Sequence, residues 1–135
     1  MAEIDWDRLF EAAQEARENA VAPYSHFRVG AAVLTADGQV YTGCNVEVSS
    51  YSLTLCAERV ALFKALSEGA RQFVAVAVVA DAEQPTPPCG ACRQVIWDFA
   101  REAQIGMRGE SGQVKILRAE ELFPEAFDQE FLPET

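Results

Sequence analysis

Three of the four cysteines lie in two short motifs that suit the binding of a metal ion. Cys56 is followed two residues later by Glu58, and Cys89 and Cys92 form a C-x-x-C pair. Both motifs stand at expected helix starts, where free amide hydrogens and the helix dipole lower the pKa of a thiol. Three protein ligands without a fourth are typical of catalytic zinc, because a tetrahedral ion then keeps one position for water. We therefore expect the three cysteines to bind one Zn²⁺ per chain and Glu58 to handle the protons of that water.

Other interpretations of these residues remain open at this point. A lone C-x-x-C pair also occurs as a redox dithiol, although the sequence around it is not thioredoxin-like. A structural site with four cysteine ligands would need Cys44, which we interpret as a buried, inert thiol in an expected strand. The only histidine, His26, lies in an expected loop, and we interpret it as a surface or hydrogen-bonded residue.

The elements that would position these motifs can be read from the hydrophobic spacing and the turn residues. A stripe of apolar side chains from Trp6 to Ala20, capped by Asp5 and ended by Pro23, predicts the first helix. Two β-branched segments around the turn at 36–38 predict a hairpin. The remaining expectations are helices at 56–68 and 89–101, a buried strand at 73–80, strands at 105–108 and 114–117, and short helical pieces at 119–123 and 125–131. This alternation indicates a three-layer α/β/α fold with a mixed sheet of about five strands.

Length and composition favour one ordinary domain spanning residues 1–135, since half of the residues are hydrophobic. Eleven basic against 21 acidic residues give a net charge of −10, which disfavours a nucleic-acid polymer and, more weakly, phosphorylated small substrates. The apolar stretch 73–80 is far shorter than the ~20 residues that a membrane span needs. The acidic N-terminus predicts no secretory signal, so we expect a cytoplasmic protein with reduced cysteines.

Four segments together make the sequence recognisable. They are PYSHFRVGAA at 23–32, GCNVE at 43–47, CAER at 56–59 and PCGACRQ at 88–94. In combination they resemble the cytidine deaminase family, in its homotetrameric zinc-dependent branch with three cysteine ligands, over nearly the whole chain. The resemblance implies hydrolytic deamination of cytidine and 2′-deoxycytidine to uridine and 2′-deoxyuridine in pyrimidine salvage. It assigns the zinc and proton-transfer roles to the same cysteines and glutamate.

The resemblance also implies contacts to a nucleoside substrate. Asn45 and Glu47 are implied to bind the ribose hydroxyls, Phe27 to contact the base, and Ala57 to belong to the substrate-binding residues. Two strand residues separated by one point to the same side, and an amide with a carboxylate can both donate to and accept from a sugar. Taken alone, the Asn45 and Glu47 pair also fits a solvated strand end. Ordinary core packing is the alternative for Phe27.

Three further residues are implied to act around the site. Arg59 is implied to donate hydrogen bonds to the cysteine sulfurs and so to withdraw part of the negative charge of three thiolates. Tyr51 and Phe127 match segments that reach into a neighbouring subunit's site, with ordinary core packing as the alternative for both. Two residues, Val48 and Leu55, depart from the family pattern beside these motifs.

Self-association as a homotetramer is expected, because a short chain cannot easily enclose a nucleoside by itself. The C-terminal segment also carries more apolar residues than its own packing needs, namely Leu122, Phe123, Phe127, Phe131 and Leu132.

Two other functions remain as alternatives. One is a blasticidin S deaminase-like enzyme, against which the ribose-binding pair counts. The other is a non-catalytic, zinc-stabilised nucleoside-binding module, which would have no need for Glu58.

Overall fold

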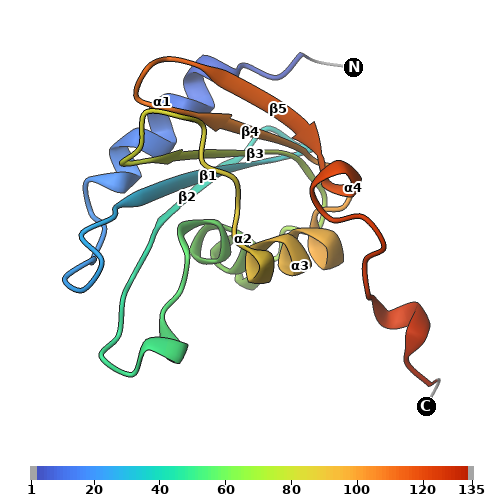
Figure 1. The fold of residues 1–135 in the computed structure, drawn as a ribbon. Helices are drawn as coiled ribbons and strands as arrows, with labels where there is room; N and C mark the ends of the chain where they lie inside the picture. The colour runs from blue at the N-terminus through green and yellow to red at the C-terminus, as the bar shows by residue number, and fades with distance from the viewer. Residues whose placement is uncertain (1–2, 134–135) are drawn as a thin grey trace.

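A mixed β-sheet forms the middle layer of the structure, with helices on both faces (Figure 1). The computed structural model describes residues 3–133, so the first two and last two residues of the expected domain 1–135 lie outside the described residues. The strands are β1 (Val29–Thr35), β2 (Val40–Cys44), β3 (Phe73–Ala80), β4 (Gln104–Arg108) and β5 (Val114–Arg118). The helices are α1 (Trp6–Arg17), α2 (Ala57–Ser67), α3 (Gly90–Phe99) and α4 (Ala119–Leu122), with 3-10 helices η1 (Tyr51–Leu53) and η2 (Gln129–Phe131).

The sheet has five strands in the order β2-β1-β3-β4-β5. β1 pairs antiparallel with both β2 and β3, β3 runs parallel to β4, and β4 pairs antiparallel with β5. The predicted hairpin is confirmed, with Gly38 at φ 90° in its turn, a conformation that glycine adopts without steric cost. The predicted mixed sheet of about five strands is confirmed as well.

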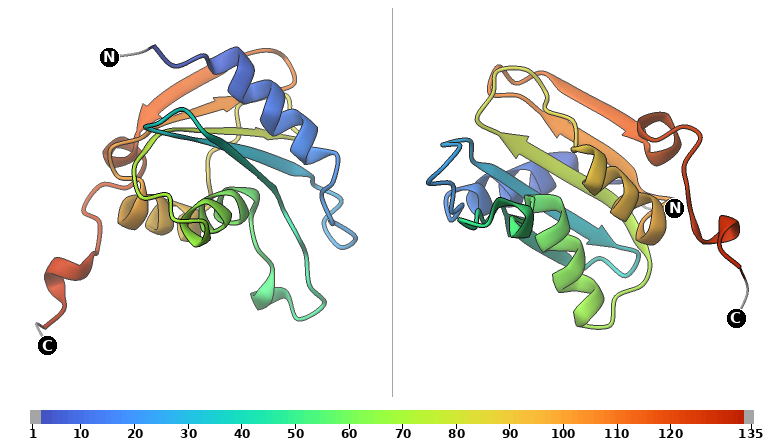
Figure 2. Two further views of the ribbon diagram at one scale, coloured as in Figure 1. Left: turned by 180° about the vertical axis from the view of Figure 1, so that it is seen from behind. Right: turned by 60° about the horizontal axis from the view of Figure 1, so that its bottom comes forward.

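The central strand β3 is buried on both faces, as its uninterrupted apolar sequence predicted. Its residues alternate between two cores. Ala75, Ala77 and Val79 pack on the face covered by α1, while Val76 and Val78 pack on the face covered by α2 and α3. Figure 2 shows α2 and α3 side by side on that second face, with α1 behind the sheet. The three-layer α/β/α prediction is therefore confirmed.

The first helix is shorter than predicted, because α1 ends at Arg17 rather than near Ala20. Its predicted N-cap is confirmed, since the Asp5 carboxylate accepts a hydrogen bond from the Arg8 N–H. Beyond the helix, Val21 donates to the Asn45 carbonyl and accepts from the Glu47 N–H. Continuing the helix would break this bridge, so the long-range pairing ends α1 before its apolar stripe does.

The predicted helical piece at 125–131 is wrong. Glu125 has φ 53°, in the left-handed region that a right-handed helix cannot include, and only η2 is helical there. The piece predicted at 119–123 is confirmed as α4, and α3 ends at Phe99 rather than at residue 101. Among the described residues, no helix is both long enough and apolar enough to cross a bilayer.

Candidate active site

The fold brings the three predicted cysteines together at one point. Cys56 is the N-cap residue of α2, Cys89 is the N-cap of α3, and Cys92 lies in the first turn of α3. Their Sγ atoms all lie within 4.8 Å of one another, and those of Cys56 and Cys89 are 3.5 Å apart. Tetrahedral zinc with Zn–S bonds of about 2.3 Å places its sulfur ligands about 3.8 Å apart. The cluster therefore fits a zinc ion, and within residues 3–133 it is the only such group of histidine, cysteine or acidic ligands.

Close packing determines where the two helix starts lie. At Gly43 on β2, an added Cβ would come within 2.7 Å of the Ala57 carbonyl oxygen, so the first turn of α2 lies directly on the strand. On the other side, the Arg93 guanidinium donates from Nε to the Pro88 carbonyl at 2.9 Å and from Nη1 to the Leu122 carbonyl at 2.8 Å. These bonds connect the loop that carries Cys89 to the end of α4.

The electrostatics of the cluster favour a thiolate at Cys56. A hydrogen bond with Cys92 lowers the pKa of Cys56 to about 5, and contacts from Arg59 and Cys89 act in the same direction. The same hydrogen bond, together with burial, raises the pKa of Cys92. Arg59 donates from Nη2 to Cys56 Sγ and to the Thr54 carbonyl, each at 3.4 Å. The Arg59 cation thus lies beside the negative charge of the Cys56 thiolate.

Glu58 is a buried carboxyl group beside the cysteines. It lies in the first turn of α2 and is 4% exposed. Burial raises the pKa of Glu58 to about 7, and the negative charge of Cys56 adds to the shift. A carboxyl group with a pKa near neutrality can both accept and donate protons during a reaction, which is the chemistry predicted for Glu58.

A cavity of about 280 Å³ opens beside Glu58 and the exposed side of the cysteine cluster. The residues predicted for the site that line it are Phe27, Asn45, Glu47, Tyr51, Cys56, Glu58 and Cys89. The lining residues that the sequence did not single out are Ser25, Val29, Thr54, Val78, Thr86 and Pro87, and Leu55 completes the wall. No lysine or arginine is among these described lining residues. A larger hollow lies at the far end of the β1–β2 hairpin, but no cysteine lines it.

Glu47 is buried just beyond the C-terminal end of β2, and its carboxylate accepts hydrogen bonds from the loop before β1. Its Oε1 accepts from the Tyr24 and Ser25 N–H groups, each at 3.0 Å, and its Oε2 accepts from the Ser25 hydroxyl. These bonds, led by the Ser25 hydroxyl, lower the pKa of Glu47. Each carboxylate oxygen has about two acceptor sites, so Glu47 retains capacity for a sugar hydroxyl. Ser25 had a signal in the sequence, because it lies within the 23–32 motif.

The Asn45 side chain joins two backbone groups of the cavity wall. Its Oδ1 accepts from the Val29 N–H at 2.9 Å, and its Nδ2 donates to the Phe27 carbonyl at 2.8 Å. One further acceptor site and one further N–H remain on the amide. Asn45 therefore shapes the wall that holds Phe27, in addition to the ribose contact that remains a prediction.

Other residues singled out in the sequence are not among those that line the cavity. Ala57 is fully buried and packs in the core between α2 and the sheet. Cys44 lies outside the cysteine cluster and is half-buried rather than buried. His26 is exposed in a loop with φ 58°. The Val48 N–H donates to Thr54 Oγ1 at 3.0 Å within the loop that ends at Cys56.

The two aromatic side chains that are expected to contact a neighbouring subunit are both exposed. Tyr51 lines the cavity of its own chain from η1 and is 57% exposed. Phe127 is 54% exposed, stacks on Phe131 with ring centres 5.7 Å apart, and is not among the residues that line the cavity. Figure 1 shows the C-terminal segment with η2 extending away from the sheet and helices.

Known proteins match this chain over the region that contains these site residues. Residues 4–107 match the family described as "Cytidine and deoxycytidylate deaminase zinc-binding region". A protein named cytidine deaminase from Sporosarcina psychrophila is 48% identical over 130 residues, covering 96% of each chain. The crystal structure of cytidine deaminase from Burkholderia pseudomallei superposes with a TM-score of 0.89 at 48% identity, covering 92% of this chain and 100% of that one. A blasticidin-S deaminase from Bacillus cereus is more distant, at 31% identity over 106 residues.

The family match and the geometry concern the same part of the molecule. The matched region contains both cysteine motifs, Glu58 and Arg59, and the structure gathers the three cysteines within zinc-binding distance. This chain therefore belongs to the zinc-dependent cytidine and deoxycytidylate deaminase family, which agrees with the resemblance found in its sequence.

Proposed function

We propose that this protein hydrolyses cytidine and 2′-deoxycytidine to uridine and 2′-deoxyuridine with release of ammonia. The observation that carries the proposal is the cavity in which a buried Glu58 stands beside three clustered cysteines. We propose that this reaction serves the salvage of pyrimidine nucleosides in the cytoplasm. The names of the relatives support the same activity.

Proton transfer is the task proposed for Glu58. Cys56, Cys89 and Cys92 would hold Zn²⁺, which would supply the Lewis acidity that makes water a nucleophile near neutral pH. Glu58 accepts a proton as the water oxygen bonds to C4 of the base, and it donates a proton to N3. Glu58 then takes the remaining proton from the oxygen now on C4 and delivers it to the amino group, so that the C4=O bond forms, the C4–N bond breaks and ammonia leaves. Arg59 offsets the charge of the thiolates from behind the cluster.

The lining of the cavity favours a nucleoside over a nucleotide. Two carboxyl groups, Glu47 and Glu58, face the cavity, and no described lining residue is basic. A phosphate group binds most readily beside arginine or lysine, so a 5′-phosphate would be poorly held here. Asn45 and Glu47 have free hydrogen-bonding capacity for the ribose hydroxyls, and Phe27 offers an aromatic surface to the base.

Direct assay of the purified protein tests this function. We expect cytidine and 2′-deoxycytidine to be converted with loss of the cytidine absorbance, and deoxycytidylate to react at least ~100-fold more slowly, the usual scale for an unmatched charged group. A zinc chelator should remove the activity, and added zinc should restore it. Conversion of blasticidin S with no reaction on cytidine would favour that alternative. Cytidine binding without any turnover would favour the binding module.

We also propose that four copies of the chain associate and that Tyr51 and Phe127 complete a neighbour's cavity. The support is the exposure of several large apolar side chains on the protruding segments, namely Tyr51, Leu53, Phe127, Phe131 and Leu132. Surfaces of this kind are typical of interfaces between subunits.

Truncation after Pro124 is expected to weaken nucleoside binding by about tenfold or more, because an aromatic contact at the cavity is lost. Zinc content should stay unchanged, since the cysteines lie outside the removed segment. Sedimentation at micromolar concentration should show a tetramer for the full chain. A fully active monomer would contradict the proposal, as would a truncated chain with unchanged affinity for uridine.

A further inference from the structure

We propose that Asp81 is a positioning residue that fixes the wall of the substrate cavity through the backbone of Arg28. The proposal rests on the function proposed above. Asp81 follows the end of β3, and Arg28 precedes the start of β1, so the two residues extend the antiparallel pairing of these strands. Neither side chain is among those that line the cavity.

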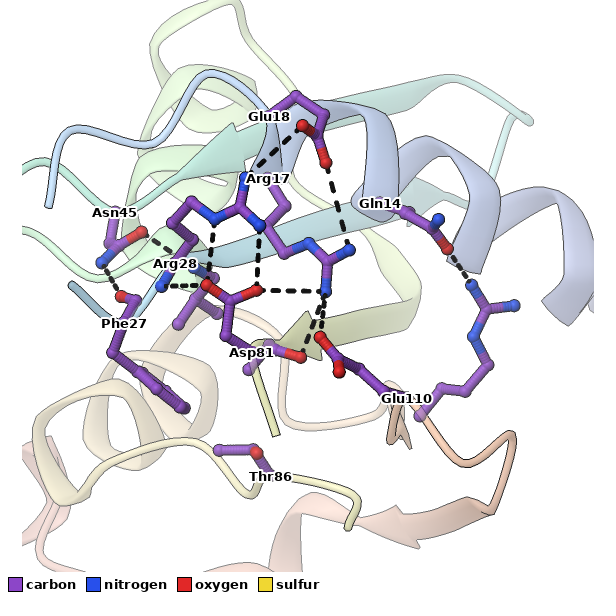
Figure 3. Close-up of polar contacts among 12 residues, drawn as sticks. Gln14, Arg17, Glu18, Phe27, Arg28, Asn45, Asp81, Thr86 and Glu110 are labelled. Carbon is purple, nitrogen blue, oxygen red and sulfur yellow. Dashed lines mark hydrogen bonds and ion pairs between the residues drawn. The ribbon is translucent and has the colours of Figure 1, made fainter. Parts of the chain in front are cut away.

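Asp81 holds Arg28 at both backbone groups and at its side chain. The Asp81 N–H donates to the Arg28 carbonyl at 3.0 Å, and Asp81 Oδ2 accepts from the Arg28 N–H at 3.0 Å. The Arg28 guanidinium donates from Nε to Oδ2 at 2.9 Å and from Nη2 to Oδ1 at 3.2 Å. Figure 3 shows the Asp81 carboxylate at the centre of this network, between the guanidinium groups of Arg28 and Arg17.

The residues on either side of Arg28 are part of the cavity wall. Phe27 and Val29 both line the cavity, and the Asn45 amide joins the Phe27 carbonyl to the Val29 N–H. Segment 27–29 is therefore held from opposite sides, by Asn45 at the first and third residues and by Asp81 at the second. Together these contacts leave little freedom for the backbone that carries the Phe27 ring.

Contacts with α1 and with the turn between β4 and β5 hold Asp81 and its neighbours in place. Arg17 is only 12% exposed, and its Nη1 lies 3.5 Å from Asp81 Oδ1 and donates to the Ala80 carbonyl at 3.2 Å. The next residues pack on the turn between β4 and β5, where the Glu110 N–H donates to the Ala82 carbonyl at 2.9 Å. The hydrogen bonds from Arg28 lower the pKa of Asp81, so the carboxylate is charged at neutral pH.

The loop that starts at Asp81 returns to the same cavity. It carries Thr86 and Pro87, which line the cavity, and then Cys89 of the metal cluster. Figure 3 shows the Phe27 ring pointing to the side of the network on which Thr86 lies. Asp81 thus connects two parts of the wall that are distant in the sequence. Without its carboxylate, we expect the wall to be looser while the cysteines and Glu58 stay in place.

The test measures nucleoside binding apart from turnover and zinc content. In Asp81→Ala, we expect the KM for cytidine and the Kd for uridine to rise about tenfold, with kcat within about threefold of the unchanged protein. Zinc should remain at one ion per chain. Amide hydrogens of residues 27–29 should exchange faster, because the Arg28 N–H loses its acceptor.

Two further variants sharpen the test. Glu18→Gln removes a charge that contacts the Arg28 guanidinium, 3.4 Å away, without touching the Arg28 backbone, and it should behave as the unchanged protein. Asp81→Asn keeps an acceptor for the Arg28 N–H but loses the charge, so it should show a smaller increase in KM and Kd. It also carries the test if Asp81→Ala does not fold.

The outcomes separate this proposal from the proposed function. If the unchanged protein does not deaminate cytidine, the function is wrong, while uridine binding and amide exchange still test Asp81. Unchanged uridine affinity and unchanged exchange at 27–29 in the Asp81 variants would overturn the positioning role. An equal loss in Glu18→Gln would also overturn it, since the effect would then come from charge alone.

Discussion

Replacing Glu58 with glutamine is expected to lower kcat for cytidine by about 10²- to 10⁴-fold or more, because the carboxyl group is proposed to transfer protons in more than one step. Glutamine has nearly the same shape but cannot accept and return a proton. The fold should not suffer, since burial already favours the neutral form of this carboxyl group and raises its pKa to about 7. The measurement is steady-state turnover together with zinc content and the melting temperature.

Glu68→Gln provides the matched control for this variant. Glu68 is the exposed residue that caps the other end of α2, so its replacement removes the same charge from the same helix. We expect it to keep normal turnover. If Glu58→Gln retained near-normal kcat with a full complement of zinc, Glu58 would have no part in the reaction.

Replacing Cys89 with alanine is expected to abolish stable zinc binding and, with it, deamination. Two thiolates would remain where a tetrahedral zinc site of this kind uses three protein ligands. Cys89 is exposed, so alanine leaves no cavity in the core and the fold should persist, whereas Cys92 is fully buried. Metal analysis after dialysis against a chelator should give about one zinc per chain for the unchanged protein and almost none for the variant.

Cys44→Ala separates the metal site from a general effect of losing a thiol. Cys44 is half-buried at the end of β2 and lies outside the cluster. The Cys44 variant should keep its zinc and its activity. Loss of zinc from Cys44→Ala, or its retention in Cys89→Ala, would mean that the ion is held by a different set of ligands.

The sequence by itself was sufficient where local chemistry is decisive. The C-A-E and C-x-x-C motifs coincide with helix starts, because the residues that begin a helix and the thiols that use its free amides lie within a few positions. The apolar segment of β3 and the hairpin turn at Gly38 likewise depend on neighbouring residues alone. From these patterns both the three-layer fold and the three-cysteine cluster could be predicted.

The features that the sequence did not reveal depend on residues far apart in the chain. α1 ends early because Val21 pairs with Val46, and the expected helix at 125–131 is broken at Asp128, whose backbone is extended and whose carboxylate accepts a hydrogen bond from the Trp97 indole N–H. Neither feature changes the spacing of apolar residues from which the helices were predicted.

The cavity wall is also a product of the tertiary structure. Thr86 and Pro87 reach it only because their loop folds back beside Phe27, and Asp81 meets Arg28 only because β3 pairs with β1. A motif identifies the groups that can hold zinc and move protons, since those groups must lie close together at helix starts. The support that keeps the substrate wall in place comes from charges and backbone groups that only the pairing of distant strands brings into contact.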